Sequence, residues 1–193
     1  IEDNKHHFGF YGPDKKIIHI PKCLQFSDNL QMLYSEFSNL KPFYNSTPIK
    51  KMSVRLRVGP NGEKGCWLDL ANIDIKNLLE DGKYLKAVLN SGFEIGQKQK
   101  RLTLINEVFK LTDPKPEVWF QTKEFKLLSH ISSFTQPSWK SADILVDTIL
   151  NWLKRLDMLN VLEFGSGIGQ FTLPLLKKNH RVISCELEEA AVE

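Results

Sequence analysis

The chain of 193 residues can bury one sizeable hydrophobic core or two small ones. Its 41% hydrophobic and 25% charged residues are ordinary for a globular protein, and no apolar run reaches the roughly 20 residues that span a bilayer. The net charge of +3 is uneven, because residues 137–193 hold six Lys/Arg against eight Asp/Glu and the first 136 residues hold twenty against fifteen. A basic front part fits contact with a polyanion, or it is a solvated surface.

The cysteines and the ends of the chain indicate its setting. Three widely spaced cysteines do not form a disulfide framework, so we expect a cytoplasmic location, and we expect no membrane partner. The chain starts without Met or a signal-peptide pattern, and it stops where the pattern of a new helix begins. We therefore expect a fragment of a longer polypeptide.

The first part of the chain mixes strand and helix patterns, which is typical of an α+β domain. Apolar alternation around turn residues predicts hairpins over 6–21 and 53–70. A Ser/Asp start followed by helically spaced apolar residues predicts a helix over 27–40. The remaining expectations are one or two short helices over 73–90 and strands over 101–112 and 117–122.

From residue 140 onward the pattern changes to alternating helices and short apolar strands. The expected elements are a helix over 141–156, a strand over 160–165, a helix over 169–179 and a strand over 180–187. Helix, strand, helix and strand of these lengths open a doubly wound parallel sheet, so a domain boundary is expected between residues 130 and 140.

Three glycines, Gly165, Gly167 and Gly169, separate the first of these strands from its helix. Glycine lets the backbone approach a ligand and take positive φ values, and the start of the next helix offers unpaired N–H groups. The spacing G-S-G-I-G departs from the dinucleotide pattern G-x-G-x-x-G, because its third glycine comes one residue early. Glu163 would also repel a pyrophosphate, whereas S-adenosylmethionine carries a sulfonium and an ammonium that suit a carboxylate.

A second acid, Glu186, ends the next predicted strand, where a carboxylate can accept hydrogen bonds from both hydroxyls of a ribose. Acid, glycine turn and second acid together predict a class I methyltransferase that binds S-adenosylmethionine. The alternative is that Glu163 and Glu186 are strand-end charges over a structural turn. The expected fold is an α+β intermediate domain over 1–135, followed by the start of an α/β Rossmann-like class I methyltransferase domain over 136–193.

Two stretches carry a closer resemblance. "FTQPS" and, about 25 residues later, "GSGIGQFTLPLL" resemble the RNA uracil-5-methyltransferases, with their F-x-Q-x-N element and their V-L-D/E-x-F/Y-C-G-x-G-N-F-S/T-L-P-L strand, turn and helix. The matching positions are Phe134, Gln136, Gly167, Gly169, Phe171, Thr172, Leu173, Pro174 and Leu175. The family modifies uridine in transfer RNA and large-subunit ribosomal RNA. The resemblance covers the whole chain and is strong from about residue 117.

The resemblance implies which residues contact the cofactor. Gln136 would reach its methionine end, Gly165 and Gln170 would line the turn, and Glu186 would hold the ribose. Four positions depart from the family pattern: Gly165 replaces an aromatic residue, Ser166 a Cys, Gln170 an Asn and Ser138 an Asn. These departures leave cofactor binding expected and put its affinity in doubt.

Cys23 ends the first predicted hairpin, where the ribosomal branch of the family has a cysteine of a 4Fe-4S iron–sulfur cluster. The other three ligands belong to a C-x5-C-x2-C run that would precede this chain. The alternative is that Cys23 is a small buried apolar residue. Cys66 and Cys185 lie within predicted strands and are expected in the core.

The resemblance also implies a chemistry that these residues do not complete. A cysteine thiolate of an S-C-N-P motif adds to carbon 6 of uracil, which makes carbon 5 nucleophilic toward the methyl group, and a Glu removes the carbon-5 proton. Neither that motif nor the preceding D-P-x-R occurs in this sequence, so we expect no catalytic residue in the chain and no activity from it alone.

The prediction is therefore an S-adenosylmethionine-dependent methyltransferase acting on carbon 5 of a uridine in RNA. Ribosomal RNA is favoured over transfer RNA only because of Cys23. Two alternatives remain: a class I methyltransferase of another substrate, and a non-catalytic module that binds RNA or a partner.

Overall fold

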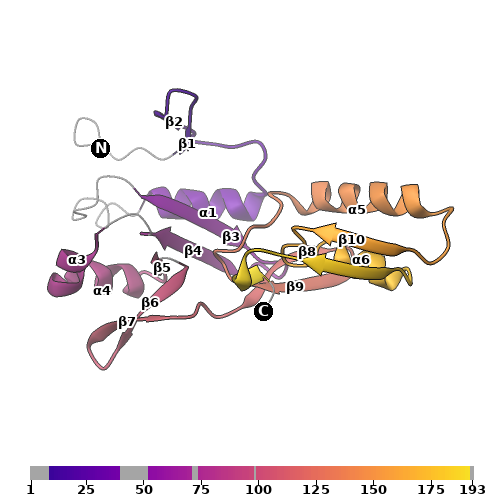
Figure 1. Ribbon diagram of the computed structural model, residues 1–193. Coiled ribbons are helices and arrows are strands. Elements are labelled where there is room, and N and C mark those ends of the chain that lie inside the picture. Colours follow the sequence, from indigo (N-terminus) through magenta and orange to yellow (C-terminus); the bar gives the residue numbers. More distant parts are fainter. Residues whose placement is uncertain (1–8, 40–51, 71–73, 98, 192–193) are drawn as a thin grey trace. The chain divides into compact units, whose positions relative to one another are not determined.

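The computed structural model describes residues 9–39, 52–70, 74–97 and 99–191, and it divides into two compact units (Figure 1). The first unit comprises Ile1–Val58 and Lys64–Pro114, and the second comprises Gly59–Glu63 and Lys115–Glu193. In the described part of the chain, none of the helices has the length and the apolar character that crossing a membrane requires.

The first unit begins with the predicted hairpin and helix. Strands β1 (Gly9–Tyr11) and β2 (Ile17–His19) pair antiparallel, and the Gly12 N–H donates to the Lys16 carbonyl at 2.8 Å within the turn. Helix α1 (Asp28–Ser38) starts where Ser27 accepts a hydrogen bond from the Leu30 N–H, as an N-cap residue does. Both predictions are confirmed.

The core of the first unit is a five-stranded sheet in the order β3-β4-β5-β6-β7. Its strands are β3 (Ser53–Val58), β4 (Lys64–Asp69), β5 (Glu94–Gln97), β6 (Lys100–Ile105) and β7 (Val108–Thr112). Helices α3 (Lys76–Asp81) and α4 (Lys83–Asn90) connect the parallel strands β4 and β5. Cys66, Leu68 and Ile95 project from one face of the sheet into a core shared with α1, α3 and α4.

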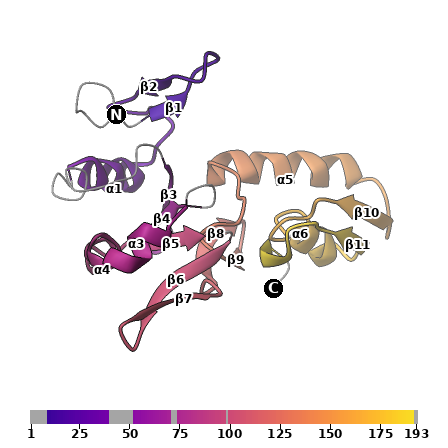
Figure 2. The same cartoon turned by 60° about the vertical axis from the view of Figure 1, so that its left-hand side comes forward.

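One turn in this unit was not predicted, and a second decides between two expectations. Residues 101–112 form two strands, because Asn106 and Glu107 take φ values of 48° and 63° and reverse the chain. Figure 2 shows β6 and β7 running together to this tip. Gly82, with φ of 62°, ends α3 and begins α4, so of the one or two short helices expected in this stretch the structure has two.

The second unit starts with a hairpin that docks on a long helix. Strands β8 (Glu117–Thr122) and β9 (Phe125–Ser129) pair antiparallel, and α5 spans Trp139–Leu153. Asp143 of α5 accepts hydrogen bonds from the Thr122 hydroxyl at 3.0 Å and from the Lys123 N–H at 2.9 Å. Phe120, Leu127 and Ala142 form the buried core there.

This hairpin shifts the division between the units. The predicted boundary at residues 135 and 136 would place β8 and β9 with the first unit, whereas the structure divides at Pro114 and Lys115. The reason is that the hairpin buries its apolar side chains against α5 and against Ile168 and Leu173, all of which belong to the second unit.

The rest of the second unit is the predicted strand, helix and parallel strand. Strand β10 (Asn160–Phe164) pairs in parallel with β11 (Arg181–Cys185), helix α6 (Thr172–Lys177) lies between them in sequence, and a short 3₁₀ turn (Glu189–Ala191) follows. The Leu159 N–H donates to Nδ1 of the buried His180 at 3.3 Å, and the Arg181 N–H donates to the Leu159 carbonyl at 2.8 Å.

One face of the β10–β11 pair carries exposed apolar side chains. Leu162, Phe164 and Ile183 on this face are 60%, 76% and 71% exposed. Cys185 pairs with Phe164 and is exposed too, so the expectation of a core cysteine is wrong there, while Cys66 is buried as expected. The alternation in β11 indicates a face that suits burial, but among the described residues of the second unit none packs over that face.

Candidate functional site

The glycine turn joins β10 to α6 and is tied to the end of β11. Gly165, Gly167 and Gly169 have φ values of 69°, 54° and 85°, a region that side chains with a Cβ resist. The N–H groups of Gly165 and Ser166 both donate to the Cys185 carbonyl, at 2.9 and 3.2 Å. The positive φ values expected of these glycines are therefore confirmed.

Space is open above this turn. A Cβ built on Gly165 or Gly167 would meet no atom within 4 Å, so packing does not explain why these positions lack side chains. Ile168, between the glycines, packs partly buried against the β8–β9 core and anchors the turn. The turn thus exposes backbone on one side and is held by an apolar side chain.

Glu186 closes the turn from the neighbouring strand. Its Oε2 accepts a hydrogen bond from the Gly167 N–H at 2.6 Å, and its Oε1 accepts from the N–H groups of Leu187 and Glu188 at 2.7 and 2.8 Å. These donors, that of Glu188 most strongly, hold the pKa of the Glu186 carboxyl below its ordinary value because they stabilise the ionised form.

Glu163 lies on β10, on the side of the strand away from the exposed apolar side chains. Its Oε2 accepts a hydrogen bond from the Thr172 hydroxyl at 2.6 Å. Both side chains are half-buried. The sequence singled out Glu163 and matched Thr172 to the family pattern, but it did not predict that the two side chains meet.

The two carboxylates decide which ligand charge the turn suits. Glu163 precedes the turn, and Glu186 already takes the Gly167 N–H that a phosphate cradle would need. An anion at this place would face two negative groups at short range. The arrangement therefore favours a neutral or cationic ligand and disfavours a dinucleotide pyrophosphate.

Two glutamines complete the set of predicted residues. Gln170 follows the last glycine and is only 7% exposed, and its Nε2 is buried without a hydrogen-bond partner. Gln136 lies half-buried between β9 and α5, and in the described part of the chain no hydrogen bond links it to the turn. The structure thus assembles Glu163, the glycines, Gln170 and Glu186 at one place, without joining Gln136 to them.

Cys23 belongs to no cluster of three or more possible metal ligands among the described residues. Its thiol is half-buried, its N–H donates to Gln31 Oε1 at 3.2 Å, and no group of three or more possible metal ligands lies in the described ranges. Cys66 is a buried core thiol whose pKa is raised by burial. The described residues therefore do not by themselves form an iron–sulfur site at Cys23.

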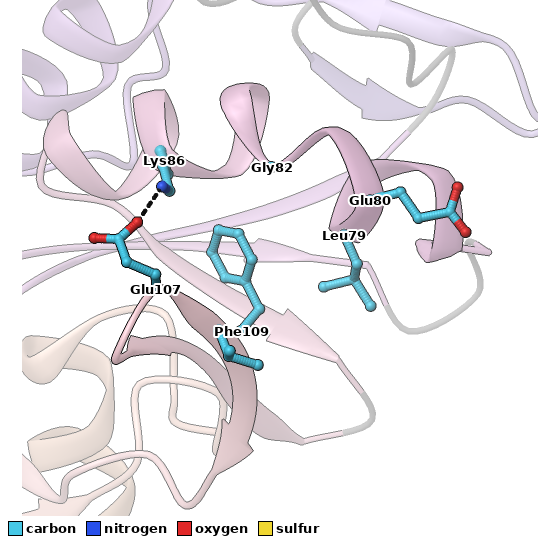
Figure 3. Close-up of a pocket in the computed structure, with 7 residues that line it drawn as sticks. Leu79, Glu80, Gly82, Lys86, Glu107 and Phe109 are labelled. Carbon is cyan, nitrogen blue, oxygen red and sulfur yellow. Dashed lines mark hydrogen bonds and ion pairs between the residues drawn. The ribbon is translucent and has the colours of Figure 1, made fainter.

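A hollow of about 310 Å³ lies in the first unit between α3, α4 and the β6–β7 turn (Figure 3). The Lys86 Nζ and Glu107 Oε2 pair at 2.6 Å across its edge, and Gly82 and Phe109 line its floor. Lys86 and Glu107 neutralise each other, and the Glu80 carboxylate points away from Phe109. The hollow therefore offers no charged group to a ligand from these three residues, and we do not take it as the candidate site.

The structure thus has a glycine turn between parallel strands, an acid before it and an acid at the end of the second strand, the arrangement from which the sequence predicted a class I methyltransferase domain. Comparison with known proteins agrees. The chain is 40% identical over 191 residues to an uncharacterized RNA methyltransferase of Bdellovibrio bacteriovorus, an alignment that covers 96% of this chain and 48% of that protein. A stretch of 60 residues, 31% of the chain, is 38% identical to a 23S rRNA (uracil(1939)-C(5))-methyltransferase of Dichelobacter nodosus and covers 14% of it.

A solved structure shares the fold. The tRNA (uracil-54, C5)-methyltransferase of Pyrococcus abyssi, crystallised with S-adenosyl-L-homocysteine, matches 96% of this chain and 47% of its own chain with a TM-score of 0.56 at 16% identity. No protein-family profile matches the chain. The resemblance to RNA uracil-5-methyltransferases is confirmed by these relatives, and the chain spans about half the length of the Bdellovibrio protein.

Proposed function

We propose that the protein containing this chain is an RNA uracil-5-methyltransferase. Residues 115–193 would contribute the glycine turn and the acidic residues of its S-adenosylmethionine site. The observation that carries the proposal is the pair of half-buried carboxylates on either side of an open glycine turn, Glu163 and Glu186. The named functions of the relatives support the same reaction.

The residues present fit S-adenosylmethionine. Glu163 keeps Oε1 for the ammonium of the methionine end, since Thr172 occupies only Oε2. Glu186 receives three backbone donors, which leaves one of about four acceptor positions of a carboxylate for a ribose hydroxyl. The buried, unpaired Gln170 Nε2 is a donor that a ligand could satisfy. When bound, the cofactor supplies a methyl group on an electrophilic sulfonium.

The remaining parts of the proposal concern groups outside these residues. We expect the nucleophilic cysteine elsewhere in the protein, because the S-C-N-P motif does not occur in these residues and Cys185 ends β11 beside Glu186, where the cofactor ribose is expected. The RNA partner, the preference for ribosomal over transfer RNA and a cytoplasmic location stay proposals. A 4Fe-4S cluster at Cys23 would need three thiolates from other segments, so no step is assigned to it.

The test begins with the native reading frame and ends with the reaction. Downstream D-P-x-R and S-C-N-P motifs, with C-x5-C-x2-C upstream, are expected in the gene. The full-length protein, given radiolabelled S-adenosylmethionine and unmodified ribosomal or transfer RNA transcripts, should yield 5-methyluridine in nucleoside mass spectrometry. A cysteine-to-alanine variant of the S-C-N-P motif is the control that should give none.

Other outcomes support the alternatives. Methyl transfer to a different base, or to protein, would replace the uracil reaction with that of another class I methyltransferase. RNA binding that S-adenosylmethionine neither requires nor alters, together with no methyl transfer, would make the protein a binding module.

A further inference from the structure

The first residue of α6 holds the acid that precedes the glycine turn. The Thr172 Oγ1 donates to Glu163 Oε2 at 2.6 Å, across the turn that connects their two elements. We propose that Thr172 is a positioning residue, which fixes the Glu163 carboxylate so that its other oxygen faces the ammonium of an adenosyl amino acid. This role rests on the proposed function.

The geometry of Thr172 suits that role. A threonine on a helix has few χ1 rotamers, and its hydroxyl often bonds the carbonyl one turn back. The residues directly before α6 form turns, and the Thr172 hydroxyl donates to Glu163 and not to a carbonyl one turn back. Because Thr172 is the first residue of α6, the helix backbone determines where this donor lies.

The hydrogen bond from Thr172 holds the Glu163 side chain in one rotamer before a ligand binds. A free glutamate loses side-chain entropy when a ligand orders it, and a side chain already held by a hydrogen bond avoids part of that cost. In the described part of the chain, Oε1 of Glu163 has no hydrogen-bond donor. One oxygen is thus held and the other is available.

The role can be separated from general stability by comparing two ligands. S-adenosylhomocysteine carries the ammonium, and 5′-methylthioadenosine keeps the nucleoside but lacks the amino-acid end. In the full-length protein, Thr172→Val keeps the side-chain shape and should weaken the binding of S-adenosylhomocysteine about tenfold. This change in affinity corresponds to the net contribution of one hydrogen bond. Binding of 5′-methylthioadenosine should not change. Thr172→Ser restores the donor and should recover most of the affinity in calorimetric titrations.

A double variant identifies the residue through which Thr172 acts. If Thr172 acts through Glu163, adding Thr172→Val to Glu163→Gln should cost no further affinity. Equal losses for both ligands, or additive losses in the double variant, would overturn the role. If Thr172→Val binds S-adenosylhomocysteine as tightly as wild-type protein does, the positioning role of Thr172 is overturned and the proposed function stands. Wild-type protein that binds neither ligand would overturn the proposed function as well.

Discussion

The backbone N–H of Gly167 donates to the Glu186 carboxylate at 2.6 Å and thereby joins the glycine turn to the end of β11. Glu186 was predicted as a ribose ligand, but in this structure three backbone donors already hold it. The same side chain therefore shapes the turn before a ligand binds. A variant at this position changes both the turn and the ligand contact.

The first prediction is a dependence of stability on acid pH that disappears with Glu186. Because the folded pKa of Glu186 lies below its ordinary value of about 4.3, its stabilising contribution is present above that value and is lost as pH falls through the folded pKa. Glu186→Gln should lower the free energy of unfolding at pH 7, and the difference from wild type should shrink toward pH 3. Urea unfolding at several pH values measures this. The matched control is Glu189→Gln at an exposed position, and an equally pH-dependent difference there would refute the assignment.

The second prediction separates backbone strain from ligand space. Gly167 and Gly92 both have positive φ, 54° and 80°, and both have open space where a Cβ would stand. Alanine at either position should cost about 1 kcal/mol of stability, since L residues resist this region. Only Gly167→Ala should also weaken S-adenosylhomocysteine, because the methyl group enters the open volume above the turn. Calorimetric titration of both variants decides, and weakened binding in Gly92→Ala would contradict the prediction.

The third prediction concerns the centre of the five-stranded sheet. A Cβ on Gly96 would come within 2.1 Å of the Trp67 ring, which is 1% exposed. Gly96→Ala should therefore overpack this region and destabilise the protein by about 1–3 kcal/mol. In the double variant with Trp67→Phe, the smaller ring should relieve part of the clash. Thermal unfolding of the single and double variants should show less than additive losses, and simple additivity would indicate that the ring is not the cause.

Short-range signals predicted the local elements well. The turn chemistry at residues 12–16 predicted the first hairpin, and the three glycines predicted a turn with positive φ. The hairpin tip at Asn106 and Glu107 was missed, because neither residue is a glycine and the apolar pattern runs across both. Strand β5 was also missed, since its four residues are too few for a clear alternation.

Long-range relationships were not available from one sequence. The helix predicted over 141–156 forms as α5, yet its apolar Leu145 is 44% exposed, because a periodic pattern says which residues share a face and not whether a layer covers that face. The bond from Gly167 to Glu186 depends on the register of β10 with β11. The rotation of α6 about its axis, which brings Thr172 to Glu163, is likewise set by packing.

The last prediction tests the two hydrogen bonds by which Asp143 of α5 holds the β8–β9 hairpin within the second unit. Asp143 accepts hydrogen bonds from the Thr122 hydroxyl and the Lys123 N–H, and Thr122 is fully buried. Asp143→Ala should cost about 2 kcal/mol, because a buried donor loses its partner. Asp147→Ala removes only an exposed ion pair with Lys123 one helical turn later and should cost less than about 0.5 kcal/mol. Urea unfolding compares the two, and equal losses would mean that negative charge on α5, and not the two hydrogen bonds, holds the hairpin.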